Sequence, residues 1–188
     1  MKRFALAALM TLGLTLAAGS DAHAASVKKD VMGRAVPVGS GRPALVFYTN
    51  QNTRETLQKH AFEQVFQLRD LRPIVVVHVD LRDVPGMFQG VAKKEVKKAH
   101  RESIQEMVRI FEKNGIEVPR DLLDDSLFMI PEPGGEANEA RGLGEGEKRV
   151  IAEAVDSDGD VVASGTYPAA APKLSKALSS ERTSVAGR

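Results

Sequence analysis

The sequence predicts an α/β domain, a three-layer sandwich in which helices cover both faces of a mixed five-stranded sheet. Two apolar runs of strand length, 43–49 and 73–80, alternate with two helical patterns. This order of elements requires right-handed crossovers between parallel strands. A Val-rich hairpin pattern follows and adds antiparallel strands. The predicted order of strands across the sheet is 126–130, 73–80, 43–49, 149–155 and 160–165.

The first strand and helix occupy residues 43–69. The run Pro43-Ala-Leu-Val-Phe-Tyr-Thr49 is apolar without alternation, which is typical of a strand covered on both faces. Asn52 precedes Glu55 by three residues, a spacing that predicts an N-cap and its reciprocal partner. From Thr53 to about Arg69, apolar residues recur at helical spacing, at Leu57, Ala61, Phe62, Val65, Phe66 and Leu68.

The second unit is a strand, a loop and a long helix. Three consecutive valines within 73–80 favour the pleated conformation, and a Pro-Gly pair predicts a loop over 83–90. The helix runs from Ala92 to about Lys113 and ends at Asn114-Gly115, because both residues tolerate the left-handed cap conformation. Its predicted inner face carries Val96, Ala99, Ser103, Ile104, Met107, Val108, Ile110 and Phe111.

The carboxyl-terminal part of the chain completes the sheet. A short strand at 126–130 precedes a glycine-rich link over 132–148, which holds one helical turn near 136–141. The two hairpin strands flank Asp156-Ser-Asp-Gly159, and an Asp-Gly pair between Val-rich runs is a strong hairpin signal. A last helix is predicted over 169–178.

The amino terminus predicts a cleavable export signal over 1–24. Lys2 and Arg3 precede an uncharged apolar stretch, and Ala22-His23-Ala24 forms a cleavage site. The apolar stretch is shorter than the roughly 20 residues that span a bilayer, and no later segment is a candidate membrane span. We therefore expect a periplasmic or secreted protein after cleavage near Ala24. The mature chain is then an extended lead-in at 25–42, a domain at 43–179 and a flexible tail at 180–188.

The composition excludes several chemistries. The chain has 188 residues and no cysteine, so it cannot form a disulfide or use a thiol. Its 26 basic and 25 acidic side chains give a formal net charge of +1, which is no general reason to expect nucleic acid or an anionic membrane as partner. The sequence contains no P-loop, nucleophile elbow or dinucleotide fingerprint. We expect no cofactor.

Several stretches resemble a known superfamily. SLFMIPEPGGEANEARGL, at 126–143, and RVIAEAVDSDGDVVASG, at 149–165, are similar to the strand, short helix and hairpin of peroxiredoxins, a branch of the thioredoxin-like superfamily. LVFYTN with its following helix resembles the first βα unit of that superfamily. The loop VDLRDVPGMF and the turn NQNTRET resemble YtfJ-type periplasmic proteins, a family of unknown function. The resemblance covers about 43–178 and implies a thioredoxin-like fold.

The resemblance also shows which chemistry this chain lacks. In thioredoxins and peroxiredoxins the reactive cysteine follows the first strand, where free N–H groups and the helix dipole stabilise a thiolate. Here Asn52 and Glu55 lie near the positions of the C-x-x-C pair, and neither can reduce a peroxide. Thiol oxidoreductase and peroxidase activities are therefore excluded, and no catalytic residue is carried over.

The carboxyl end of 43–49 is a candidate ligand-binding crevice. In the predicted strand order, connections leave this strand in opposite directions, which is where open α/β sheets bind ligands. The start of the following helix could also hold an anion. The alternative is that Asn52 and Glu55 only cap the helix. The polar residues available here are Thr49, Asn50, Asn52, Thr53 and Glu55.

His78 and Asp80 form a second candidate site. They lie two residues apart on one strand, so their side chains share a face near its carboxyl end. An acid–base or metal role is one interpretation, but a structural metal site needs about four ligands. His60 and His100 lie on different helices, and we predict no metal site. A buried, hydrogen-bonded pair, or a half-exposed strand end, is the alternative.

Two charged clusters have structural explanations. Asp156, Asp158 and Asp160 do not form a calcium loop, because Val161 and Tyr167 stand where Gly and Glu are required, and the hairpin turn explains them. The second helix begins with a basic half that either faces solvent or meets an acidic partner. Its residues are Lys93, Lys94, Lys97, Lys98 and Arg101.

The sequence thus predicts an exported, cysteine-free module that binds a partner and has no catalytic role. The partner is unknown, and a periplasmic protein or peptide is one candidate, whereas nucleic acid is not. The alternative is a non-redox enzyme that uses His78 and Asp80, or the turn at Asn52. A purely structural accessory protein is the third hypothesis.

Overall fold

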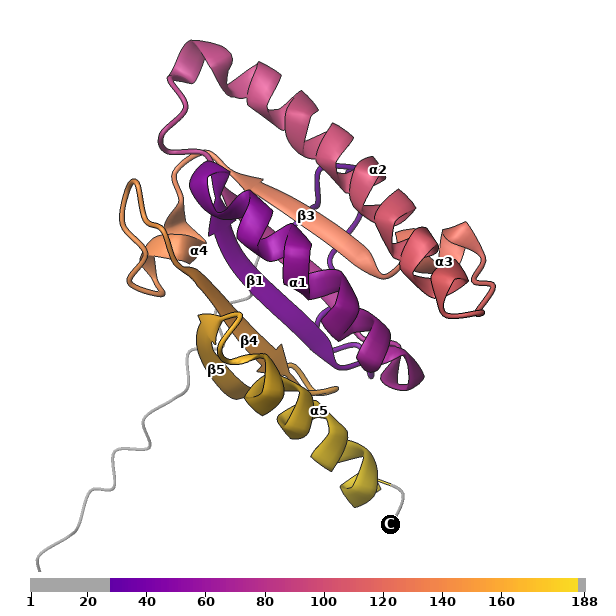
Figure 1. Cartoon of the computed structure of the whole chain (residues 1–188). Coiled ribbons are helices and arrows are strands. Elements are labelled where there is room, and N and C mark those ends of the chain that lie inside the picture. Colours follow the sequence, from indigo (N-terminus) through magenta and orange to yellow (C-terminus); the bar gives the residue numbers. More distant parts are fainter. Residues whose placement is uncertain (1–27, 186–188) are drawn as a thin grey trace, which may run out of the picture.

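A computed structural model describes residues 28–185, so the predicted export signal at 1–24 lies outside the described residues. One sheet of five strands has the order β3-β2-β1-β4-β5 (Figure 1). β1 is parallel to β2, which is parallel to β3, while β4 is antiparallel to β1 and to β5. The bounds are Ala44–Asn50 for β1, Ile74–Asp80 for β2, Leu127–Glu132 for β3, Val150–Val155 for β4 and Val161–Tyr167 for β5. The predicted strand order is confirmed, and it is a thioredoxin-like arrangement.

Helices lie on both faces of the sheet. Three long helices, α1, α2 and α5, lie in front of the sheet in Figure 1, while the short α4 lies on the other face. α1 and α2 share a face because both crossovers step in the same direction across the sheet. The helices are α1 Arg54–Gln67, α2 Gln89–Lys113, α3 Arg120–Asp124, α4 Glu136–Glu139 and α5 Ala171–Val185, and the 3₁₀ turns are η1 Gln51–Thr53, η2 Arg69–Leu71 and η3 Gly86–Phe88.

Two cores form, because successive side chains of a strand point to opposite faces. The larger core lies beneath α1, α2 and α5 and contains Phe47, Val77, Phe62, Met107 and Leu174. The smaller core is covered by α4, the loop after it and the lead-in, and it contains Val46, Tyr48, Val76, Phe128, Ile130, Ala137, Leu143 and Val36.

The lead-in protects the edge of the sheet at β3. The Val31 N–H donates to the Met129 carbonyl (2.7 Å), and Arg34 Nη2 donates to the Leu127 carbonyl (2.7 Å). Arg34 Nη2 also pairs with Asp30 Oδ2 at 2.6 Å. These bonds occupy groups on an edge strand that would otherwise be open to pairing with another chain.

The turn chemistry follows the sequence prediction. The Asp156 N–H donates to the Asp160 carbonyl (2.9 Å), and Asp156 Oδ1 accepts from the N–H groups of Asp158 (3.0 Å) and Asp160 (2.8 Å). Gly159 has φ of 100° and Gly115, at the end of α2, has φ of 73°, both in the region that favours glycine. The hairpin turn therefore accounts for these aspartates.

Helix bounds differ from the predicted ones in three places. α2 begins at Gln89, before the predicted start, because Gly90 is tolerated within its first turn. α5 continues to Val185, past the predicted end at 178. The five residues of α3 were not predicted, since so short a segment shows little periodicity.

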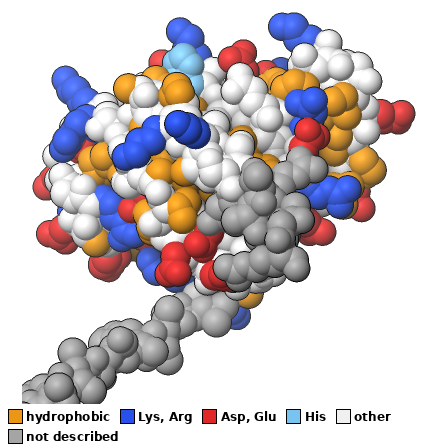
Figure 2. Space-filling view, turned by 90° about the horizontal axis from the view of Figure 1, so that it is seen from below, with side chains coloured by type: hydrophobic (Ala, Val, Ile, Leu, Met, Phe, Trp, Pro, Cys, Tyr) orange, Lys and Arg blue, Asp and Glu red, His pale blue; other side chains and the backbone are white. Residues whose placement is uncertain are grey.

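The described surface is mixed in charge. Figure 2 shows acidic and basic side chains interspersed on the face that it displays, in keeping with the small formal net charge of +1. Within residues 28–185, none of the helices has the length and apolar character needed to cross a membrane.

Candidate functional site

The turn after β1 is organised by Asn50. Its Oδ1 accepts from the N–H groups of Asn52 (3.0 Å) and Thr53 (3.2 Å), and its own N–H donates to Thr53 Oγ1 (3.0 Å), which completes a capping box. The prediction that Asn52 is the N-cap was wrong, because η1 intervenes between the strand and α1. Asn52 and Glu55 are exposed, and Glu55 lies in the first turn of α1, where the helix dipole favours negative charge.

Hydrogen bonds link the side chains at 49–53 to one another and to distant parts of the chain. Thr49 Oγ1 and Thr53 Oγ1 lie 2.8 Å apart, and Asn50 Nδ2 donates to the Glu147 carbonyl (2.8 Å). Asn138 Nδ2, from α4, donates to the Thr49 carbonyl (3.0 Å). Thr49, Asn50 and Thr53 are all buried. These side chains close the end of the strand.

His78 lies on the face of the sheet opposite α1 and α2. Its Nδ1 is 2.6 Å from Glu132 Oε1, which also accepts from Lys28 Nζ (2.7 Å), while Glu132 Oε2 accepts from the Ala137 N–H (2.8 Å). Burial alone raises the pKa of Glu132, but the hydrogen bonds from His78, Lys28 and Ala137 outweigh it and lower the pKa to about 2. Glu132 is therefore a carboxylate that fixes the orientation of the His78 ring.

A second buried network adjoins His78. The Tyr48 ring stacks on His78 with centroids 5.0 Å apart, and its hydroxyl donates to Glu153 Oε2 (2.8 Å). Arg141 pairs with the same carboxylate at 3.1 Å and lies over the Tyr48 ring at 4.5 Å. Burial, and then the bond to Glu153, raises the pKa of Tyr48 above its ordinary value. The network joins β1, β2 and β4 to the loop after α4.

Asp80 shares a face with His78 but binds different partners. Asp80 Oδ2 pairs with Arg82 Nη2 at 2.7 Å, and the same Nη2 donates to the Leu143 carbonyl (2.8 Å). The bond to Asp80 is the main cause that raises the pKa of Arg82. His78 and Asp80 are therefore both buried and hydrogen-bonded, each to a different partner. Among the described residues no group of three or more His, Asp or Glu could hold a metal ion.

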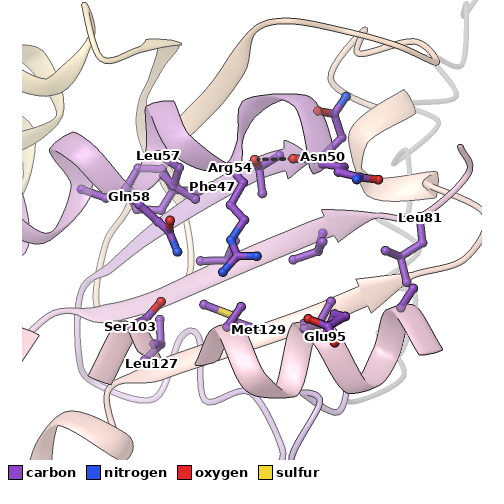
Figure 3. A pocket seen from close by; sticks show the side chains of 18 of the residues that line it. Phe47, Asn50, Arg54, Leu57, Gln58, Leu81, Glu95, Ser103, Leu127 and Met129 are labelled. Atoms are coloured by element: carbon purple, nitrogen blue, oxygen red, sulfur yellow. Dashed lines mark hydrogen bonds between the residues drawn. The ribbon is translucent and has the colours of Figure 1, made fainter. Parts of the chain in front are cut away.

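A large cavity lies between α1, α2 and the sheet, beside the carboxyl end of β1. Its volume is about 500 Å³, and apolar side chains provide most of its lining. Figure 3 shows side chains from both helices and from the strands converging on this space. The floor is formed by Phe47, Val75, Val77, Leu127 and Met129, and the walls by Leu57 and Phe62 of α1 and Val96 of α2.

The cavity exists because α1 and α2 present small side chains to each other. At one end Phe66 and Phe111 pack edge to face with centroids 5.1 Å apart. Farther along, Arg54 Nη2 and Glu102 Oε2 bridge the two helices at 3.0 Å. The two helices contact each other at these points, and the lining of the space between them includes the short side chains of Ala61, Ala92, Ala99 and Ser103.

The cavity contains one buried hydroxyl without a partner. Ser103 is 2% exposed, and its Oγ makes no hydrogen bond with any described residue. Figure 3 shows Ser103 on the α2 side of this space, with Arg54 and Gln58 of α1 and Glu95 of α2 beside it. The Ser103 Oγ itself is covered by neighbouring atoms. This arrangement could enclose an apolar molecule and offer it one internal hydrogen bond.

The sequence predicted only part of this site. Thr49 and Asn50 line the cavity, whereas the other predicted residues, Asn52, Thr53, Glu55, His78 and Asp80, do not. The prediction placed Ala99 and Ser103 correctly on the inner face of the helix. Their small side chains were the one feature of the sequence that could have indicated a cavity there. The sequence did not indicate Arg54, Gln58 and Glu95 as cavity residues. They border the cavity only because α1 and α2 lie side by side in the fold, which the sequence pattern of a single helix does not show.

Comparisons with known proteins give structural neighbours only. No family model matches the sequence, and no curated protein matches it. Among solved structures, the chain is similar to StoA from Bacillus subtilis, with 7% identity over 80% of this chain and 93% of that one and a TM-score of 0.45. It is also similar to the MTB protein dsbF, with 13% identity over 81% of this chain and 92% of that one and a TM-score of 0.43. A third similar structure is Etrx1, an exposed lipoprotein thioredoxin of Streptococcus pneumoniae. Its sequence identity is 12%, the match covers 73% of this chain and 85% of that one, and the TM-score is 0.39.

Proposed function

We propose that this chain is an exported, non-catalytic binding protein that encloses an apolar or amphipathic small molecule between α1, α2 and the sheet. The observation that carries the proposal is the cavity of about 500 Å³, with the Ser103 hydroxyl, which has no partner among the described residues, buried in its wall. Ligand pockets in proteins typically measure roughly 300–1,000 Å³, with mainly apolar walls and a few convergent polar groups. The absence of cysteine removes thiol chemistry and leaves a scaffold suited to binding.

The cavity is partly open to solvent, because the exposed side chains of Arg54, Phe88 and Glu95 border it. Its floor is nevertheless apolar and wider than the small voids that close-packed interiors contain. Leaving such a space empty forfeits the dispersion contacts of its walls, and apolar walls hold water poorly. A bound apolar molecule restores those contacts. Binding should therefore stabilise the folded chain.

The lining also indicates the chemistry of the ligand. The walls are apolar, and Ser103 supplies one hydroxyl that can donate or accept a hydrogen bond. At the rim Arg54 is paired with Glu102, and Glu95 adds a second carboxylate, so the rim carries no excess of positive charge. We infer a ligand with a neutral apolar body and one hydrogen-bonding group.

The proposal is tested with N-phenyl-1-naphthylamine, a neutral apolar fluorophore with one N–H group. Its emission should rise on titration with the exported chain and should fall on addition of competing apolar ligands. Ala99→Phe fills the cavity and should weaken the binding at least tenfold. Ala177→Phe, on α5 and outside the cavity, is the matched control and should bind as the unaltered chain does.

Circular dichroism and thermal unfolding must show that both variants are folded. If the folded Ala99→Phe variant binds the fluorophore as tightly as the control, the ligand site is not this cavity. If the unaltered chain does not change the emission at all, the binding function itself is wrong.

Two finer assignments accompany this proposal. We place the chain in the peroxiredoxin-type branch, near YtfJ-type proteins, on the succession of β3, α4, β4 and β5 and on the loop at 79–88. We place the mature protein in the periplasm or outside the cell, on the signal pattern over 1–24. An absence of turnover with dithiol and peroxide substrates is the corresponding expectation, and turnover would contradict it.

A further inference from the structure

The start of α2 carries an exposed apolar cluster. Met87 is 84% exposed, Phe88 53% and Val91 56%, and all three lie within five consecutive residues of η3 and the first turn of α2. Single exposed apolar side chains are normal on protein surfaces, but neighbouring ones mark an interaction site. Met87 is the most exposed large apolar residue of the described chain.

Basic side chains continue this surface along α2. Val91, Lys94, Lys98 and Arg101 follow one another at helical spacing, so they share one face, and all four are exposed. Lys93 and Lys97 flank this row. Among the described residues only Lys98 of this group has an ion pair, with Glu102 Oε1 at 3.8 Å. Glu102 is already bonded to Arg54, and Glu95 is the one exposed carboxylate among Lys93, Lys94, Lys97, Lys98 and Arg101, so this stretch of α2 keeps a net positive charge.

We propose that this surface docks on an anionic phospholipid membrane. Met87, Phe88 and Val91 would enter the interface between headgroups and acyl chains, while the lysines and Arg101 contact lipid phosphates. Surfaces that combine a few apolar side chains with a row of lysines bind anionic lipid by inserting the first and pairing the second with phosphates. The exposed apolar cluster of Met87, Phe88 and Val91, with lysines beside it, therefore fits an anionic lipid surface.

The docking surface adjoins the mouth of the cavity. Phe88 and Val91 belong both to the exposed cluster and to the cavity lining. A docked molecule would therefore hold the cavity entrance against the bilayer, where apolar molecules are dissolved. This goes beyond the proposed binding of a ligand, because it states where the ligand is taken up or released. The formal net charge of the whole chain is only +1, so it does not indicate that basic residues gather on this face of α2.

Sedimentation with lipid vesicles tests the proposal. The exported chain is mixed at low ionic strength with vesicles of phosphatidylcholine alone, or of phosphatidylcholine with about one-third phosphatidylglycerol. Binding is expected to the anionic vesicles only and is expected to weaken as salt is added. Lys94→Gln with Lys98→Gln should lower the partition coefficient about 25-fold, at about fivefold for each basic residue near the membrane. The matched control is Lys173→Gln with Lys176→Gln on α5, which should bind as the unaltered chain does.

A second variant tests the apolar contribution. Met87→Ser, Phe88→Ser and Val91→Ser together should lower the partition coefficient at least about tenfold, because apolar area no longer enters the bilayer. No binding to anionic vesicles, or equal binding by the α2 and α5 lysine variants, would overturn the proposal. Self-association that the triple serine variant abolishes, without vesicle binding, would also overturn it and show a protein interface instead.

The two proposals can fail separately. The lysine variant of α2 leaves the cavity lining intact, so its affinity for N-phenyl-1-naphthylamine should equal that of the unaltered chain. Loss of vesicle binding with retained fluorophore binding is therefore the expected result. If the unaltered chain binds the fluorophore but does not bind anionic vesicles, the docking proposal is wrong and the proposed ligand binding in the cavity is unaffected.

Discussion

Ser103 is one of four described residues whose buried side chain holds a polar atom without a hydrogen-bond partner, beside Gln64, Asn138 and Tyr167, and it is the one that lines the cavity. A buried hydroxyl without a hydrogen-bond partner costs roughly 1–3 kcal/mol, and its Oγ has no partner among the described residues. The other cavity residues of α2, such as Ala92 and Ala99, only leave space, whereas Ser103 adds a polar group to it. This cost is recovered when a ligand accepts or donates at that oxygen.

Ser103→Ala should therefore stabilise the ligand-free chain. We expect the free energy of unfolding in urea to rise by about 1 kcal/mol, since an unsatisfied polar atom is removed at little cost in volume. Ser126→Ala is the matched control and should lower the free energy of unfolding, because the Ser126 hydroxyl donates to the Leu122 carbonyl at 2.8 Å. A loss of stability in Ser103→Ala would show that the hydroxyl has a partner.

Glu132 makes the stability of the chain sensitive to acid. Its pKa of about 2 lies below the ordinary 4.5, so its contribution is fully present above pH 4.5 and is lost as the pH falls from 4.5 toward 2. Glu132→Gln should remove about 1–3 kcal/mol at pH 7 and flatten the stability profile over that interval. Urea unfolding at several pH values measures this, with the exposed Glu117→Gln as control. An equally steep profile in Glu132→Gln would contradict the assignment.

At the scale of elements, the turn between β1 and α1 shows what a local pattern can and cannot specify. Asn52 and Glu55 have the spacing of an N-cap and its partner, but so do Asn50 and Thr53. The structure uses the second pair, and Asn50 Nδ2 also reaches the Glu147 carbonyl, 97 residues away in the sequence. That bond favours Asn50 over Asn52 as the cap. It could not be predicted from the local sequence, because its two partners are far apart along the chain.

Alanine substitutions at the two asparagines separate these registers. Asn50→Ala should lower the free energy of unfolding by about 2 kcal/mol, since it removes a cap and a buried bond. Asn52→Ala should change it by less than about 0.5 kcal/mol, because the Asn52 side chain is exposed. Equilibrium urea unfolding measures both variants. The reverse order of effects would mean that Asn52 is the cap after all.

Most regular elements were predictable because their signals are local. The valines of 73–80 mark β2 almost to the residue, and the Asp-Gly pair marks the turn between β4 and β5. The partners of buried polar groups were not predictable. His78 bonds to Glu132, 54 residues farther along the chain, and Tyr48 bonds to Glu153, 105 residues away. Such pairs depend on strand register, which no pattern within one strand reveals.

At the scale of the whole molecule, the cavity results from how two helices sit on one face of the sheet. The sequence assigned α1 and α2 to the same sheet and predicted their inner faces correctly, but it gave no distance between them. The helices contact each other at Phe66 and Phe111 and at Arg54 and Glu102, and each of these contacts joins residues of different helices. The cavity is a property of the assembled fold.

The export signal is a prediction about the whole chain that mass spectrometry can check. When the full chain is expressed in a bacterium, the mature protein should begin at Ala25, because Ala22-His23-Ala24 matches a signal-peptidase site. Ala24→Asp should block cleavage and leave the precursor mass. A mature protein that retains residues 1–24 in the unaltered chain would contradict the predicted export.

The central claim, that α1, α2 and the sheet enclose an apolar ligand, is tested most directly by nuclear magnetic resonance. Intermolecular nuclear Overhauser effects would be measured between N-phenyl-1-naphthylamine and the methyl groups of the exported chain. We predict contacts to Val75, Val77, Leu127 and Met129, which form the cavity floor. Contacts confined to exposed methyl groups such as that of Leu122, with none from the floor, would contradict the claim.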